Sequence, residues 1–246
     1  MSEQFADGVA VARSPIAPAP PVRVEAGWEV SGARSDAALT ITDCTPLVKV
    51  HLRAPWNGAM AKALGVPFGR CGREDAGPGS AGSGGDETLI PPAPPRNPDG
   101  GWLVVGSGPG EWLVLAPPGA AAAAAVGGWL DTVAADSAPE EFVSVVDLTH
   151  GRALMRITGP DAAELMARLC GADLHDDMAP DGAALRAPVA GVATDIIRDD
   201  IRVDGAGVPS YLLHCERSSG QYLFGALVSA GEPLGIGVDG FRLPGI

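Results

Sequence analysis

Two periods of apolar positions follow one another between residues 142 and 171 and predict two strands and a helix. Apolar side chains recur at every second position over 143–145 and 153–157, which is typical of half-buried strands with a break at Gly151. The turn at 159–161 contains a proline at a helix start, and apolar residues then recur at helical spacing up to Gly171. This stretch is therefore a strand, strand, turn and helix unit.

The same two periods predict the other elements. Strands are expected at 22–30, at 39–52 with a break near Pro46, in a hairpin at 101–116, and at 183–187, 192–197 and 210–215. Helices are expected at 57–64 with Asn57 as cap, at 119–133, and at 218–230 with Ser218 as cap.

The two halves of the chain have the same order of patterns. Residues 47–65 correspond to 152–171 as strand, turn and helix, and residues 110–130 correspond to 210–229 as strand and helix. We therefore predict a single α+β domain over 39–232, built of two pseudo-repeated strand-helix-strand-strand-helix units.

Three segments lie outside this pattern. Residues 1–38 begin Pro-rich and without periodicity, so we expect a flexible N-terminal arm. Residues 71–100 are rich in Gly, Ser, Pro and acidic residues, which bury too little apolar area to offset the entropy of ordering, so we expect a flexible insert. Residues 233–246 have no strand or helix period and are expected to form a C-terminal tail.

Charge and hydropathy exclude several classes of function. The chain of 246 residues has a formal net charge of -13 with only 17 Lys and Arg, which argues against binding to nucleic acid or to anionic membranes. It contains neither a signal-peptide pattern nor an apolar run of the roughly 20 residues that a membrane span needs. We therefore expect a cytoplasmic protein.

Few residues are spaced for chemistry. The four cysteines lack a CxxC pair and the four histidines lack metal-ligand spacing, so no metal site is predicted. The glycines at 106–110 lead into a strand-like segment rather than a helix, so we predict that the chain binds no flavin or nicotinamide. The acidic pairs 176–177 and 199–200 are expected in solvated turns. His150 either orients a substrate or, as we favour, hydrogen-bonds to backbone.

Several short runs resemble the gamma subunit of heterotetrameric sarcosine oxidase, which is itself similar to the folate-binding aminomethyltransferase (T-protein) fold. The runs are Asp147-Leu148-Thr149-His150, Arg156-Ile157-Thr158-Gly159-Pro160, the segment 169–174, and Gly108-Pro109-Gly110-Glu111-Trp112-Leu113. The resemblance implies a structural, non-catalytic subunit that acts with alpha, beta and delta subunits in demethylating sarcosine to glycine. It also implies FAD, FMN and NAD in the other subunits, with tetrahydrofolate as the one-carbon acceptor.

The resemblance also singles out a remnant of a folate site. The T-protein pattern Gly-Gly-x-x-Asp-Asp corresponds to residues 190–195, so Asp195 is retained and Thr194 replaces the other carboxylate. A folate-contacting Asn is replaced near Cys215. We predict that Asp195, Thr194, Cys215 and His150 form this vestigial site and that the chain has no catalytic residue. The alternative is a free-standing folate-dependent one-carbon transferase or folate-binding protein.

Overall fold

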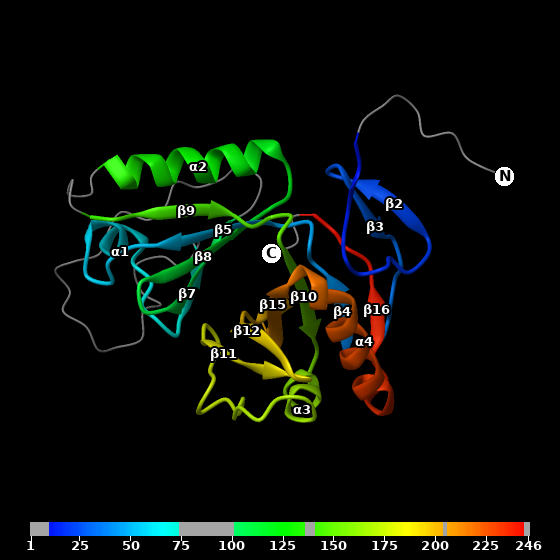
Figure 1. Cartoon of the computed structure of the whole chain (residues 1–246). Coiled ribbons are helices and arrows are strands. Elements are labelled where there is room, and N and C mark those ends of the chain that lie inside the picture. The colour runs from blue at the N-terminus through cyan, green and yellow to red at the C-terminus, as the bar shows by residue number, and fades with distance from the viewer. Residues whose placement is uncertain (1–9, 74–100, 136–140, 204–205, 244–246) are drawn as a thin grey trace.

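The computed structural model describes residues 10–73, 101–135, 141–203 and 206–243. Two central sheets dominate it (Figure 1). The five-stranded sheet has the order β6-β7-β8-β5-β9. Its strands are β5 (Val48–Arg53), β6 (Cys71–Arg73), β7 (Leu103–Gly108), β8 (Glu111–Ala116) and β9 (Ser144–Asp147).

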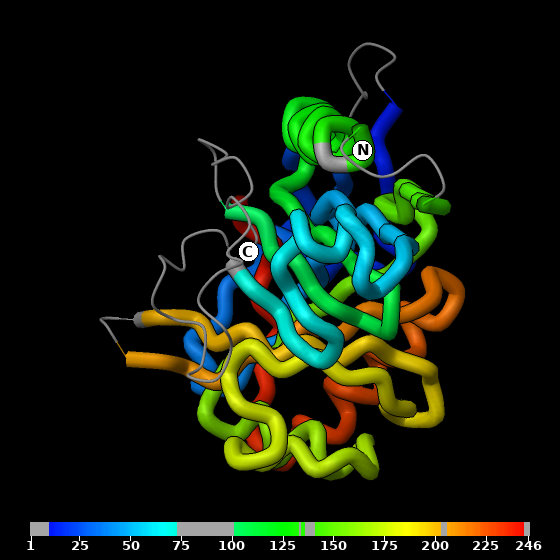
Figure 2. Tube along the Cα trace, turned by 90° about the vertical axis from the view of Figure 1, so that its left-hand side faces the viewer, coloured from blue at the N-terminus to red at the C-terminus, as the bar shows by residue number. Residues whose placement is uncertain are grey.

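The six-stranded sheet has the order β11-β12-β15-β10-β4-β16. Its strands are β4 (Thr40–Asp43), β10 (Arg152–Thr158), β11 (Ala184–Val189), β12 (Val192–Arg198), β15 (Ser210–Glu216) and β16 (Gly237–Asp239). All neighbours are antiparallel except β16, which lies parallel to β4. A further hairpin of β13 (Ile201–Val203) and β14 (Ala206–Val208) projects between β12 and β15 (Figure 2).

Helices cover the outer face of each sheet. Figure 2 shows α2 above the five-stranded sheet, with β11 and β12 below it. Helices α1 (Ala59–Leu64) and α2 (Ala120–Ala135) share one buried cluster with the five-stranded sheet, and α3 (Ala162–Ala167) and α4 (Gly220–Gly231) share another with the six-stranded sheet. A third cluster, containing Leu113, Leu154 and Leu212, lies between the sheets. The layers are thus helices, sheet, sheet, helices, which confirms the mixed α+β class.

The helix ends differ from those predicted. Helix α1 begins two residues after Asn57, and the Glu141 carboxylate accepts a hydrogen bond from the Ala59 N–H at 2.8 Å, so a distant acidic group provides the cap. Helix α4 begins at Gly220, after a 3-10 turn over Arg217–Ser219, and Ser218 does not cap it.

The turn before α3 requires a glycine. Gly159 has φ of +142°, and a Cβ at this position would overlap the carbonyl oxygen of Ala38. The Gly-Pro-Asp turn read from the sequence therefore brings the start of α3 against the chain that leads into β4.

The described part of the N-terminal segment is not a flexible arm. Residues 10–38 contain β1 (Ala12–Arg13), β2 (Val22–Glu25) and β3 (Trp28–Ser31), which form a sheet of order β1-β3-β2. Three apolar side chains of this segment are buried: Ile16 in the cluster with α3 and α4, and Trp28 and Val30 in the cluster between the two central sheets. The expectation was wrong here because alternating Val and Trp positions are enough for short strands that pack on an existing core.

The other two boundary predictions also change. Residues 233–246 were expected to form a tail, but β16 extends the six-stranded sheet and Phe241 is buried between the sheets. The predicted insert at 71–100 begins too early, because Cys71–Arg73 is strand β6, paired with β7. Residues 74–100 lie outside the described residues.

Candidate functional site

Three polar side chains form a row across the six-stranded sheet, on the face toward the other sheet. Arg186 on β11 is opposite Asp195 on β12, and Asp195 is opposite His214 on β15. A two-residue turn at Ala190 and Gly191, with φ of 49° and 80°, joins β11 to β12 and sets this register. Residues directly opposite in an antiparallel pair point to the same face, so the three side chains meet.

Asp195 is bound on both carboxylate oxygens. The Arg186 Nε donates to Oδ1 at 2.6 Å, and the His214 Nδ1 lies 3.0 Å from Oδ2. The Asp195 side chain is only 15% exposed. Burial by itself would raise its pKa, but the hydrogen bonds from His214 and Arg186 outweigh burial, and the pKa of Asp195 is lowered. Asp195 is therefore a carboxylate near neutral pH.

His214 is 4% exposed, and its ring is held by Asp195. Burial lowers its pKa, and the attraction of Asp195 offsets only part of this effect, so the ring is neutral at pH 7. Because Asp195 is ionised, the Nδ1 carries the proton and donates it to the carboxylate. The Nε2 has no hydrogen-bond partner among the described residues and is buried.

Arg186 connects this row to the five-stranded sheet. Its guanidinium lies 3.6 Å from the Glu111 carboxylate on β8, which also binds Arg53 at 2.8 Å and lies 4.0 Å from the His51 Nε2. An open cleft of about 590 Å³ adjoins Glu111 and Arg186. It is lined by Phe68, Ser107, Pro109, Leu185 and their neighbours. The Glu111 carboxylate and the Arg186 guanidinium therefore both border this cleft.

The sheet separates the residues that the sequence grouped together. Thr194 and Cys215 are opposite one another and point into the cluster under α3 and α4, away from Asp195. The Thr194 Oγ1 donates to the Val192 carbonyl at 2.9 Å, and burial raises the pKa of the Cys215 thiol to about 11. Neither side chain reaches the Asp195 face.

His150 lies against the N-terminal sheet. Its ring stacks on Trp28 with centroids 4.8 Å apart, and its carbonyl accepts a long hydrogen bond from Arg217 at 3.5 Å. None of the contacts among the described residues joins it to Asp195. Of the four predicted residues, only Asp195 lies in the polar row.

The sequence prediction missed Arg186, His214 and Glu111. The tight turn at 190–191 was a usable signal, because it places residue 186 opposite residue 195. His214 is a polar residue within an apolar strand, which is a weaker signal. Glu111 comes from the other sheet, and no local pattern relates it to Asp195.

The acidic pair 199–200 is also not solvated as expected. Asp199 is buried and accepts from the Arg156 Nη2 at 2.8 Å. Asp200 binds the Arg198 Nε at 3.0 Å. Both carboxylates are therefore bound by arginines just after β12, with Asp199 buried and Asp200 partly buried.

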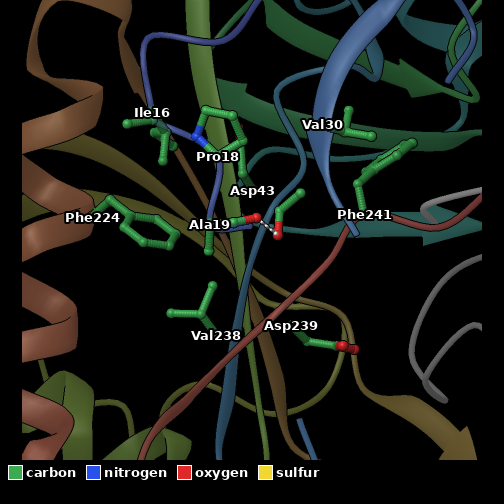
Figure 3. A pocket seen from close by; sticks show the side chains of 11 residues that line it. Ile16, Pro18, Ala19, Val30, Asp43, Phe224, Val238, Asp239 and Phe241 are labelled. Atoms are coloured by element: carbon green, nitrogen blue, oxygen red, sulfur yellow. Dashed lines mark hydrogen bonds between the residues drawn. The ribbon is translucent and has the colours of Figure 1, made fainter. Parts of the chain in front are cut away.

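A second, smaller cavity of about 60 Å³ lies where the N-terminal segment meets β4, α4 and β16 (Figure 3). Ile16, Phe224 and Val238 surround it, and Asp43 and Asp239 each contribute a carboxylate to its lining. Burial raises the pKa of Asp43 despite hydrogen bonds from Ser14 and Thr45. The cavity is too small and apolar to indicate a cofactor.

A family model, the GCVT N-terminal domain, matches residues 110–242, which include Glu111, Arg186, Asp195 and His214. The chain belongs to this family. The match contains the whole polar row and most of the six-stranded sheet. A search of curated proteins found no match.

Two solved structures share the fold of this GCVT-family chain. One is a heterotetrameric sarcosine oxidase from Corynebacterium sp. U-96, at 20% identity and a TM-score of 0.55, with 82% of this chain and 88% of that chain covered. The other is the glycine cleavage system aminomethyltransferase T from Bartonella henselae, at 16% identity and a TM-score of 0.57. There the alignment covers 91% of this chain and 56% of the aminomethyltransferase. The predicted resemblance to both kinds of protein is thereby confirmed.

The described residues contain neither a membrane-spanning helix nor a cluster of metal ligands. None of their helices is long and apolar enough to cross a membrane. They also contain no group of three or more His, Cys, Asp or Glu side chains placed to hold a metal ion.

Proposed function

We propose that this chain is the gamma subunit of a heterotetrameric sarcosine oxidase and that it acts as a structural subunit. The complex would demethylate sarcosine to glycine in the cytoplasm. The alpha, beta and delta subunits would complete it, with FAD, FMN and NAD bound outside this chain and tetrahydrofolate accepting the one-carbon unit. The likeness over 88% of a chain of such an oxidase supports this assignment.

The state of Asp195 is the observation that carries the structural role. A general acid or base works best with a pKa near the working pH and with access to its substrate. Asp195 has a lowered pKa, and both of its oxygens are already bound to Arg186 and His214. The geometry is that of an ion pair that ties strands together.

We also propose that the chain is one domain of two related units. The strand orders β6-β7-β8-β5-β9 and β11-β12-β15-β10-β4 support this. The first four strands of each order follow one another along the chain in the same way, so that β5, β6, β7 and β8 correspond to β10, β11, β12 and β15. The last strands, β9 and β4, are the exception. Strand β9 pairs with the first unit but precedes the second unit in the chain, and β4 pairs with the second unit but precedes the first. This exchange links the two units. The cluster between the sheets draws residues from both, so we expect them to unfold together.

A folate-dependent one-carbon transferase or folate-binding protein is the second candidate. The open cleft beside Arg186 and Glu111 favours it, because folate carries carboxylates that an arginine binds well. In that case the Arg186 guanidinium would hold the ligand, and Asp195 would lie one strand away from it.

Co-expression with the alpha, beta and delta subunits of the same genome tests the first proposal. The chain purified alone should be colourless and should assemble with these subunits. The complex carrying Asp195→Asn should give the wild-type ratio of methylene-folate to free formaldehyde per sarcosine oxidised. Asp177→Asn, at a side chain that is 91% exposed, is the matched control.

The two candidates give opposite results in this assay. A fall of about 100-fold in the ratio with the complex intact, as a lost acid or base group produces, would favour the transferase and overturn the structural role. A flavin bound stoichiometrically to the chain alone would contradict the assignment of flavins to the other subunits.

A further inference from the structure

The edge strand β9 carries a group of large apolar side chains that are exposed. Strand β9 pairs with β5 on one side, and none of the described residues pairs with its outer edge. Opposite Ser144 lies Arg53, so the residues just beyond, Phe142 and Trp56, lie at the same end of this pair. The exposed fractions are 74% for Trp56, 79% for Phe142, 46% for Val145 and 44% for Val146. We call these four residues and the outer edge the β9 edge.

In the six-stranded sheet, the edge that corresponds to β9 pairs with a further strand. In the six-stranded sheet, β4 occupies the position next to β10 that β9 occupies next to β5, and both outer strands are antiparallel to their neighbours. Beyond β4, the chain adds β16 in parallel, with Gly237 opposite Thr40 and Asp239 opposite Thr42. The corresponding position beyond β9 has no strand among the described residues (Figure 1).

Unpaired edges readily template pairing with another chain, and native proteins protect them with charge, proline or a covering element. Strand β9 reads Ser-Val-Val-Asp, with one charge at its end and no proline. Adjacent valines point to opposite faces, so both faces of the edge are apolar. Trp56 and Phe142 add aromatic side chains of the kind that anchors interfaces.

We propose that the β9 edge binds an extended apolar segment of a different subunit, which adds to the five-stranded sheet as a sixth strand. This proposal rests on the assembly put forward above and names the surface through which it forms. A second copy of the chain is disfavoured because each copy carries a net charge of -13 and would repel the other. The exposed Asp147 at the end of β9 favours a partner strand with a basic residue there.

The test uses the chain co-expressed with the alpha, beta and delta subunits of a sarcosine oxidase. Val145→Lys places a charge on the edge, and Phe142→Ala removes an aromatic anchor. Both positions are exposed, so the isolated variants should melt like wild type. Each should weaken binding to the other subunits by at least about tenfold. Val24→Lys, at an exposed valine of the edge strand β2, is the matched control and should bind like wild type.

Hydrogen exchange at residues 144–147 gives a second readout that does not depend on substitution. In the isolated chain part of these amides should exchange freely, and in the complex they should slow by at least about tenfold. Amides that are already protected in the isolated chain, or that do not change on assembly, would contradict the proposal. A dimer of the isolated chain that Val145→Lys disrupts would replace it with self-association.

The outcomes separate this inference from the proposed function. If the complex forms and both variants bind like wild type, the gamma-subunit assignment holds and the β9 edge is not the interface. If the wild-type chain does not assemble with the three subunits, both proposals fail.

Discussion

The two central sheets both bury charged side chains, but at different positions. If β10 is superposed on β5, as the two-unit proposal requires, a row of paired residues across the six-stranded sheet corresponds to a row across the five-stranded sheet. In the six-stranded sheet the row is Asp195, His214 and Leu154, and in the five-stranded sheet it is Leu103, Leu115 and Lys49. Each sheet is apolar where the other is polar.

In both sheets the buried charge has hydrogen-bond partners, but the partners are of different kinds. Asp195 is held by side chains of neighbouring strands, whereas the Lys49 Nζ donates to the carbonyls of Thr45 and Leu47 at 2.6 and 2.7 Å. An unpaired buried charge would cost several kcal/mol. The outer edges differ as well, because β16 covers β4 and no described strand covers β9.

The largest expected effect concerns the covered edge. Phe241→Ala removes a side chain that is 1% exposed and leaves a cavity between the sheets, so it should lower the free energy of unfolding by about 3 kcal/mol or more. Urea denaturation measures this. Leu243→Ala, two residues later at a half-exposed position, should change it by less than about 0.5 kcal/mol. Equal effects would mean that the C-terminal segment does not anchor the sheet.

Asp195→Asn breaks the polar row and should cost about 2 kcal/mol at pH 7, because Arg186 and His214 lose a charged acceptor. The pKa of Asp195 is lowered, so its contribution is complete above its unfolded pKa of about 3.9 and is lost as pH falls through the lower folded value. Stability curves of wild type and variant should therefore converge below about pH 4. A constant difference down to pH 2 would exclude the ion pair as the cause.

Lys49, the buried charge of the five-stranded sheet, should make the stability of the protein depend on pH. Burial lowers its pKa to about 7, so between about pH 7 and 10 the unfolded chain holds the proton more strongly than the folded one. Stability should then rise with pH, by up to about 1 kcal/mol per pH unit. Lys49→Met should abolish this rise, and the exposed Lys62→Met should keep it. A fall of stability with pH that depends on Lys49 would reverse the assigned sign.

The smallest effect is expected when the two polar positions of the row in the six-stranded sheet are given the residues of the other row. Asp195→Leu combined with His214→Leu copies Leu103 and Leu115, and stability should stay within about 1 kcal/mol of wild type, because the charge and its partner leave together. Each single change should cost more than the pair, giving a coupling of about 1 kcal/mol or more in a double-mutant cycle. Additive effects would show that Asp195 and His214 are not energetically coupled.

Local patterns were sufficient for most elements. Alternating residues located β10, β12 and β15, helical spacing located α2 and α4, and the Pro46 break separated β4 from β5. Family membership also followed from short runs such as 147–150 and 156–160. These features depend on neighbours within a few residues, which is why the sequence alone predicts them.

The partners of each strand depended on the tertiary structure. The adjacent strands β9 and β10 join different sheets, and β16 reaches β4 from nearly 200 residues away in the chain. Asp195 acquires His214 from β15 and, through Arg186, Glu111 from the other sheet. Packing of the core sets the register between strands distant in sequence, and a shift of one residue would turn Asp195 to the face of Thr194. The sequence therefore determined the elements and the retained carboxylate, and only the assembled sheets determined what that carboxylate binds.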